Sequence, residues 1–367
     1  MNKILILANN DAGLYKFRKE LIYELVNNYE VYISLPNGPY IKKLKDMGCK
    51  FVNTQINRRG TNPISDLKLL LKYKSIIKEI RPSVVLTYTI KPNIYGGLAC
   101  RLARAPYIAN ITGLGTAIEN KGILQKISLF LYKIGLKNSS CVFFQNDSNK
   151  QFFLKKELVK EKVANLIPGS GVNLKQYSYE KYPDDEKTIR LLYIGRLMKA
   201  KGIEELLKAS EKVKKLYPNV YFELIGASEE DYTKRINELC ELGIIKYHGE
   251  QGDVRPFIKN SHSVILPSYH EGTSNVLLES ASLGRPILAS KVPGCIETFD
   301  EGVSGFGFKT RSEDSLVEVI ERFINLSYEE KEAMGKAGRI KMEKEFDRNI
   351  VIDAYMNEIV KIMKKEI

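Results

Sequence analysis

Two positively charged residues follow an apolar run in the C-terminal half of the chain. Arg196 and Lys201 stand in GRLMKAKG, between the run IRLLYI and a helical pattern. Gly195 permits a tight turn there, and the start of a helix offers backbone N–H groups to an anion. Arginine can grip a phosphate through two hydrogen bonds, and lysine adds a compact charge. The segment predicts a diphosphate site that neutralises a leaving group. A solvated basic loop is the alternative.

A second segment, PSYHEGTSNVLLE, also follows an apolar run and opens a helix. The N–H groups at its start, around Gly272, Thr273 and Ser274, suit phosphate or sugar hydroxyls. Glu271 precedes the helix, and Glu279 lies about two turns in, roughly 10 Å further along the axis. Carboxylates that far apart must have different roles, so one is expected to contact a sugar and the other a ribose. The alternatives are a helix-dipole residue for Glu271 and a surface ion pair for Glu279.

Short apolar runs alternate with helical patterns along the whole chain. The first half contains the strand candidates ILILA, VYISL, FVNT, SVVLTY, YIANI and CVFFQ, with helices expected at 14–28 and 40–47. The second half contains IRLLYIG, VYFELIG, IIKYHG, HSVILPS and PILAS, with helices expected at 203–216, 230–242, 254–260 and 273–283. This alternation predicts an α/β fold with two doubly wound, Rossmann-like parallel sheets.

The length of 367 residues indicates two domains. The stretch 168–187, PGSGVNLKQYSYEKYPDDEK, is typical of a linker. We therefore expect an N-terminal domain over 1–170, a C-terminal domain over 188–345, and a final helix over 346–367 that packs back on the N-terminal domain. Two doubly wound domains facing each other leave a central cleft at the carboxyl ends of their strands, where such folds bind ligands.

One region carries +6 of the formal net charge of +13. Between Lys121 and Lys160, eight lysines and two acidic residues interleave with apolar side chains. This pattern is typical of an amphipathic helix on an anionic membrane surface. A lysine-covered face above an ordinary core helix is an equal alternative. The N-terminus lacks a secretory pattern, and no apolar run is long enough to span a bilayer. We expect a cytoplasmic protein, peripherally associated with the inner face of the membrane.

Several other functions are disfavoured by the sequence. Five scattered cysteines without a CxxC pair and three histidines without ligand spacing argue against a metal site. The GLG at 113–115 lacks the third glycine of a dinucleotide fingerprint, so NAD binding is rejected. The pI of 9.2 raises nucleic-acid binding as an alternative, but the basic residues elsewhere are dispersed among acidic ones and tryptophan is absent. No cofactor and no nucleic-acid partner are expected.

Taken together, the motifs resemble those of the retaining glycosyltransferases of family 4. Glu271 and Glu279 match the EX7E motif of that family, and GR followed by KG looks like its diphosphate loop. Four further segments are similar to a branch that builds bacterial capsule, O-antigen, lipopolysaccharide and related glycans: SVVLTYTIKPNIYG, NITGLGT, PSYHEGTSNVLLES and VPGCIETFDEGVSGF. The resemblance covers nearly the whole chain.

The resemblance implies a GT-B fold, a UDP-sugar as co-substrate, no metal, and transfer with retention of anomeric configuration. By this likeness Arg196 and Lys201 hold the diphosphate, Glu271 contacts the donor sugar and Glu279 binds the ribose. The same likeness implies that the donor is also approached by backbone at Gly13, Gly195, Gly226, Gly249 and the segment from Gly272 to Asn275. The acceptor implied is an undecaprenyl-diphosphate-linked saccharide, and the sugar is of the N-acetylhexosamine type.

The N-terminal half is expected to carry the acceptor side. Lys16, Arg18 and Lys91 are candidates for an acceptor diphosphate, with solvated side chains as the commoner explanation. Many family members have a histidine where this chain has Thr112 and Gly113, so no general base is assigned. The alternative reaction is that of a UDP-sugar 2-epimerase, which shares the architecture. It requires acid and base groups in both domains, and the first domain has no histidine.

Overall fold

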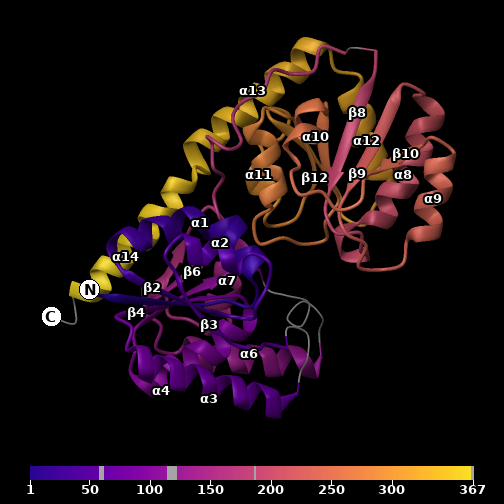
Figure 1. Cartoon of the computed structure of the whole chain (residues 1–367). Coiled ribbons are helices and arrows are strands. Elements are labelled where there is room, and N and C mark those ends of the chain that lie inside the picture. The colour runs from indigo at the N-terminus through magenta and orange to yellow at the C-terminus, as the bar shows by residue number, and fades with distance from the viewer. Residues whose placement is uncertain (58–61, 114–121, 186, 365–367) are drawn as a thin grey trace. The chain divides into compact units, whose positions relative to one another are not determined.

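Each half of the chain forms its own parallel sheet. The computed structural model describes residues 1–57, 62–113, 122–185 and 187–364. These divide into two units (Figure 1), unit 1 with Met1–Ser170 and Asn349–Ile367 and unit 2 with Gly171–Arg348. The GLG segment named above lies outside the described residues apart from Gly113, and Lys121 lies outside them as well.

Unit 1 contains a seven-stranded sheet in the order β3-β2-β1-β4-β5-β6-β7, with all neighbours parallel. The six strands predicted in the first half are confirmed. The strands are β1 (Lys3–Leu7), β2 (Glu30–Leu35), β3 (Lys50–Asn53), β4 (Val84–Tyr88), β5 (Tyr107–Ile111), β6 (Cys141–Phe144) and β7 (Ala164–Leu166). Continuous apolar runs form these strands because helices cover both faces of the sheet.

The helices of unit 1 form two layers. One layer packs on the core shared by α1 (Asp11–Asn28), α2 (Ile41–Asp46) and α14 (Arg348–Lys364). The other contains α3 (Pro63–Ile80), the π-helix η1 (Pro92–Gly96), α4 (Gly97–Ala103), α6 (Ile123–Leu136) and α7 (Asp147–Lys155), followed by the short η2 (Glu161–Val163). Helix α1 begins three residues earlier than predicted. The cause is Asn10, whose side chain accepts a hydrogen bond from the Gly13 N–H and caps the helix.

Unit 2 contains a six-stranded parallel sheet in the order β10-β9-β8-β11-β12-β13. Its strands are β8 (Ile189–Ile194), β9 (Val220–Ile225), β10 (Ile245–Tyr247), β11 (Ser263–Leu266), β12 (Ile287–Ser290) and β13 (Gly305–Phe308). Its helices are η3 (Lys199–Lys201), α8 (Ile203–Leu216), α9 (Thr233–Glu241), α10 (Arg255–Asn260), α11 (Asn275–Ser282), η4 (Ile296–Thr298), α12 (Glu313–Ile324) and α13 (Tyr328–Glu345). Strand β13 was not predicted, because the glycines in GFGF weaken the strand pattern.

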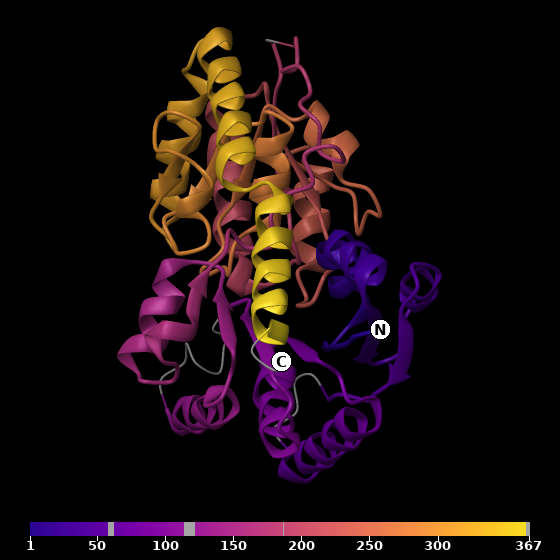
Figure 2. The same cartoon turned by 90° about the vertical axis from the view of Figure 1, so that its left-hand side faces the viewer.

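The C-terminal helical region is divided in two. Helix α13 ends at Glu345, and α14 begins at Arg348 and returns to unit 1, as the yellow ribbon in Figure 2 shows. At the break Val172 donates to the Phe346 carbonyl and accepts from the Arg348 N–H. Four residues of α14 join the core beside β1 and β4: Val351, Tyr355, Ile359 and Ile362. The stretch 171–187, expected to be a linker, belongs to unit 2.

A buried arginine fixes that stretch to unit 2. The Arg285 guanidinium is fully buried and donates hydrogen bonds to backbone carbonyl groups of the 171–187 stretch and of the ends of α10 and α11: Glu180, Lys181, Ile258, Lys259, Leu283 and Gly284. Burial lowers the pKa of Arg285 to about 10, so the side chain remains charged at neutral pH. Carbonyl dipoles stabilise that charge.

His262 holds the next turn of the same stretch and makes folding sensitive to acid. Its Nδ1 accepts from the Arg190 N–H at 3.0 Å, so its Nε2 carries the proton and donates to the Asp185 carbonyl at 3.0 Å. Burial lowers the pKa of His262 from 6.5 to about 4. The unfolded chain therefore binds this proton first as the pH falls.

We expect His262 to stabilise the fold above pH 6.5 and to lose about 3 kcal/mol of that contribution as the pH falls to about 4. Urea unfolding of the wild type and of His262→Gln between pH 7 and pH 4 measures this. The free energy of unfolding should fall more steeply with pH in the wild type than in His262→Gln. Parallel pH curves for the wild type and His262→Gln would contradict the assignment.

Candidate active site

The strand order of unit 2 reverses between β8 and β11, and both predicted anion-binding segments follow these two strands. Ligands of open α/β sheets bind at such a reversal, beyond the carboxyl ends of the strands. The Tyr269 N–H donates to the Ala200 carbonyl at 3.0 Å, which joins the two segments. Gly202 has a φ of +71°, and a Cβ there would lie 2.1 Å from the Pro267 carbonyl oxygen. Glycine is therefore required where the two backbones meet.

The structure brings Lys201 and Glu271 together. The Lys201 Nζ lies 2.5 Å from Glu271 Oε1, and the two side chains are only 21% and 15% exposed. The Cys295 thiol is close by: burial and the Glu271 charge hold its pKa well above the usual range. A buried neutral thiol therefore lies near the pair. Cys295 was quoted in the VPGC motif, but the sequence assigned it no place in the site.

Arg196 is also paired, at a more exposed position. Its Nη1 lies 2.8 Å from both carboxylate oxygens of Glu229, and its side chain is 50% exposed. The Tyr193 hydroxyl donates to the Arg196 carbonyl and fixes the backbone of the loop. Both cations predicted for a diphosphate thus have a glutamate partner. The glutamate partners compensate the charges of the two cations before a ligand binds. An incoming diphosphate would then take the place of these carboxylates.

The three predicted glycines Gly195, Gly226 and Gly249 meet at the ends of β8, β9 and β10. Gly195 donates to the Ile225 carbonyl and Gly226 to the Gly249 carbonyl, each at 2.9 Å. Gly226 has a φ of +147°, and a Cβ there would lie 1.8 Å from the Gly195 carbonyl oxygen. A side chain at this position is therefore excluded. Bare backbone at adjacent strand ends is suited to the close approach of a ligand.

The start of α11 is held in place by the loop after β12. Ser274 caps the helix by accepting from the Leu277 N–H, and its own N–H donates to the Gly294 carbonyl at 2.9 Å. Gly272 and Thr273 precede this cap. The Asn275 Oδ1 is buried and has no hydrogen-bond partner among the described residues. A buried acceptor of this kind indicates a donor group supplied from outside, such as water or a ligand hydroxyl.

Glu279 lies within α11 beside Tyr177, a residue that the sequence did not indicate. Burial, and then the Glu279 carboxylate, raise the pKa of the Tyr177 hydroxyl. Arg348 and Arg255 act on the same hydroxyl in the opposite direction. Glu279 therefore belongs to a polar cluster at the helix that includes Tyr177.

The candidates of unit 1 are Gly13 for the donor and four residues for the acceptor, and they lie in different surroundings. Gly13 lies in the first turn of α1 rather than in a loop, because Asn10 caps that helix. Lys16 is exposed near the Tyr40 ring, and Thr112 is exposed after β5. Arg18 is buried, donates to the Phe17 carbonyl and stacks 5.2 Å from the centre of the Tyr88 ring.

Lys91 is half-buried and forms an ion pair with Asp66, whose other oxygen accepts from the Tyr95 hydroxyl. The structure therefore gives Lys91 and Arg18 contacts within unit 1. Lys16 and Thr112 remain exposed positions among the acceptor-side candidates.

Two known families match the two halves of the chain. Residues 175–341 match the family described as glycosyl transferases group 1, and residues 3–146 match the glycosyl transferase 4-like family. The chain is 26% identical to N,N'-diacetylbacillosaminyl-diphospho-undecaprenol alpha-1,3-N-acetylgalactosaminyltransferase of Campylobacter jejuni, over 99% of each chain. It is 26% identical to the capsular polysaccharide biosynthesis glycosyltransferase CapM of Staphylococcus aureus, over 95% of this chain and 94% of CapM.

A solved structure shows the same fold. HepE of Anabaena, crystallised with UDP and glucose, superposes with a TM-score of 0.80 at 18% identity, covering 98% of this chain and 100% of HepE. Both relatives named above are glycosyltransferases, which favours transfer over the 2-epimerase and nucleic-acid-binding alternatives. The chain therefore belongs to the glycosyltransferases of GT-B fold, with a C-terminal half of the group 1 family and an N-terminal half of the glycosyl transferase 4-like family.

Proposed function

We propose that this enzyme transfers a sugar of the N-acetylhexosamine type from a UDP-sugar to an undecaprenyl-diphosphate-linked saccharide, with retention of anomeric configuration. The observation that carries the proposal is the Lys201–Glu271 pair at the reversal point of the unit 2 sheet, beside the start of α11. The pair puts a cation for a diphosphate directly beside a carboxylate for the sugar. Neither residue alone would distinguish a transferase from any anion-binding protein.

In the proposed reaction each charged residue of the site has its own role. Lys201 and Arg196 contact the diphosphate of the donor and stabilise the negative charge that develops when the bond from the sugar carbon to the UDP oxygen breaks. Glu271 contacts the sugar, and Glu279 binds the ribose. The acceptor hydroxyl forms its new bond to the same face of the sugar, and its proton passes to the departing phosphate oxygen. The cationic side chains supply the positive charge, so the proposal requires no metal ion.

The choice of substrates is supported by the relatives. The Campylobacter jejuni enzyme is named for an acceptor on diphospho-undecaprenol and for the transfer of N-acetylgalactosamine. HepE was crystallised with UDP and glucose, which supports a UDP-sugar as donor. A lipid-linked acceptor also requires work at a membrane surface, and we propose the inner face of the cytoplasmic membrane.

The test is UDP release from UDP-GlcNAc, UDP-GalNAc, UDP-glucose and UDP-galactose, each with and without undecaprenyl-diphosphate-linked acetamido sugars. We expect release to depend on the acceptor and to be fastest with an N-acetylhexosamine donor. NMR of the product should show the anomeric configuration of the donor. Release that is equal without acceptor, or an inverted linkage, would contradict the proposal.

A further inference from the structure

Helix α6 has an apolar face that the fold of unit 1 does not use. Its Tyr132 and Leu136 are buried against the core. A different stripe, at helical spacing, points away from that core and is between 49% and 79% exposed: Ile123, Leu124, Ile127 and Phe130. Exposed apolar groups of this size and spacing mark an interaction surface, whereas scattered single ones do not.

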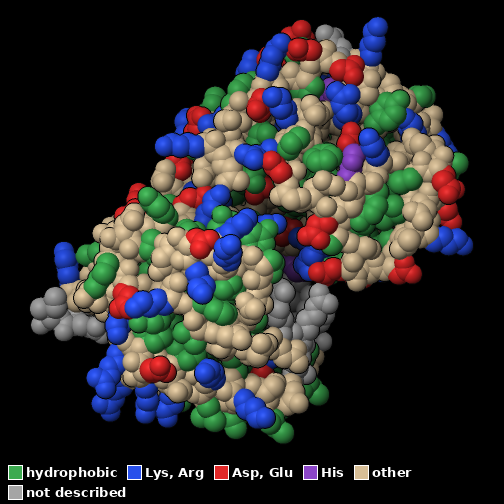
Figure 3. All heavy atoms as spheres, in the orientation of Figure 1, with side chains coloured by type: hydrophobic (Ala, Val, Ile, Leu, Met, Phe, Trp, Pro, Cys, Tyr) green, Lys and Arg blue, Asp and Glu red, His purple; other side chains and the backbone are tan. Residues whose placement is uncertain are grey.

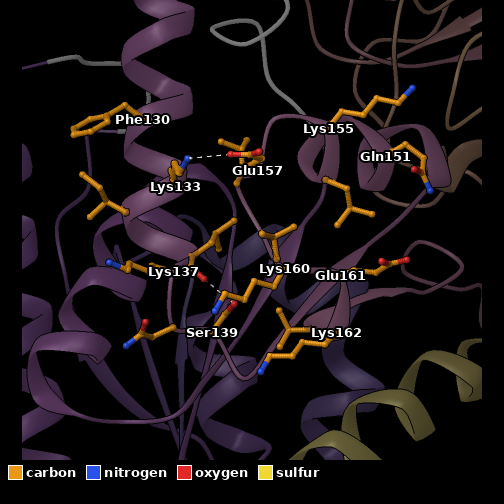
Figure 4. A pocket seen from close by; sticks show the side chains of 17 residues that line it. Phe130, Lys133, Lys137, Ser139, Gln151, Lys155, Glu157, Lys160, Glu161 and Lys162 are labelled. Carbon is orange, nitrogen blue, oxygen red and sulfur yellow. Dashed lines mark hydrogen bonds and ion pairs between the residues drawn. The ribbon is translucent and has the colours of Figure 1, made fainter.

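A groove lined by lysines continues this stripe. It has a volume of about 1130 Å³ and lies between α6, the end of α7 and the segment that contains η2. Phe130, the last residue of the exposed stripe, also lines it (Figure 4). The lysines on its wall come from both sides of the groove: Lys133, Lys137, Lys155, Lys160 and Lys162. Of these, Lys133 forms an ion pair with Glu157 at 3.8 Å.

The charge around the stripe is positive on balance, although Glu157 and Glu161 also line the groove. Residues 122–163 contain eight lysines and three acidic residues, so the described part of this region keeps a surplus of five positive charges. In the same helical layer, α3 adds exposed apolar residues at a spacing of three and four: Ile64, Leu67 and Leu71. In Figure 3, hydrophobic side chains gather along the lower end of unit 1, with Lys and Arg side chains nearby.

We infer that α6 and its lysine groove form the surface by which this enzyme docks on a bilayer that contains anionic phospholipid. The apolar stripe enters the interface between head groups and acyl chains, and the lysines bind lipid phosphates. None of the described helices is long and apolar enough to cross a membrane, so docking of this kind would be peripheral. A second copy of the chain would bring a like-charged groove against this one, which the charge disfavours.

The inference rests on the proposed function for its setting, because a lipid-linked acceptor places the reaction at a membrane. The docking itself requires neither donor nor acceptor. It is therefore measured with vesicles that contain no undecaprenyl lipid, and its failure is distinguishable from a failure of sugar transfer.

The experiment is co-sedimentation of the full chain with vesicles of phosphatidylcholine, alone or with about 30% phosphatidylglycerol. We expect binding to the anionic vesicles only, weakened by high salt. Two independent double variants, Ile127→Glu with Phe130→Glu and Lys137→Glu with Lys160→Glu, should each lower binding at least about tenfold.

The matched control is Leu242→Glu, which changes an exposed apolar side chain of unit 2 and should bind vesicles like the wild type. All substituted side chains are exposed, so thermal unfolding should match the wild type. Equal binding to both kinds of vesicle, or wild-type binding by both double variants, would overturn the inference. A dimer that Phe130→Glu abolishes, without vesicle binding, would also overturn it and assign the face to a second copy.

Discussion

Replacing Lys201 with alanine is expected to raise the barrier to sugar transfer by about 2 to 4 kcal/mol, which lowers kcat/KM roughly 30- to 1000-fold. The reason is the position of its ammonium group at the sheet reversal, next to the carboxylate assigned to the sugar. From that position the ammonium group would stabilise the charge that develops on a leaving diphosphate. Arg196→Ala should act in the same direction, since Arg196 stands on the same loop.

The control for this prediction comes from the same turn. Lys199 lies two residues before Lys201 in η3, but its side chain is mostly exposed and pairs with Glu204 at 3.6 Å. Lys199→Ala should therefore keep nearly the wild-type rate. Steady-state kinetics with saturating acceptor separate the variants. Near-normal rates in both Lys201→Ala and Arg196→Ala would refute the assignment of the diphosphate site.

Replacing Glu271 with glutamine is expected to separate catalysis from product binding. Transfer should fall by a factor of about 100, because the charged contact to the donor sugar is lost. Affinity for UDP should stay the same or rise, because the carboxylate that pairs with Lys201 is no longer charged and the ammonium is available to the diphosphate. A residue that served only to stabilise the fold would lower both quantities together.

The measurements are transfer kinetics and calorimetric titration with UDP, on the wild type and Glu271→Gln. Glu204→Gln is the matched control, since it neutralises the partner of Lys199 on the same side of unit 2. It should leave both quantities unchanged. If Glu271→Gln weakens UDP binding in proportion to the loss of rate, Glu271 supports the shape of the pocket and the role given to it here is wrong.

Local signals in the sequence predicted much of the fold. Helix α8 has the predicted bounds of 203–216, because Gly202 and the amphipathic pattern that follows define it locally. The two segments predicted to bind an anion do lie where a strand meets a helix, as their apolar runs and helical patterns indicated. Strand β13 was not predicted, because its glycines weaken the apolar pattern that indicates a strand.

Contacts between residues that lie far apart in the chain could not be predicted from the sequence. Lys201 and Glu271 were both predicted, but their pairing depends on β8 and β11 being neighbours in the sheet. The carbonyl cage of Arg285 joins three separated segments and leaves no sequence motif. Lys91 looked like a lysine for an anion because its partner Asp66 lies 25 residues away in the chain.

The central claim is that Lys201, on a loop of unit 2, holds the diphosphate of a nucleotide sugar while the Glu271 carboxylate beside it contacts the sugar. Calorimetric titration of UDP into the wild type, Lys201→Ala and Lys199→Ala tests it most directly. The account predicts that UDP binds the wild type and Lys199→Ala alike and that Lys201→Ala weakens binding at least about tenfold. Equal UDP affinity in all three proteins, or no UDP binding by the wild type, would contradict it.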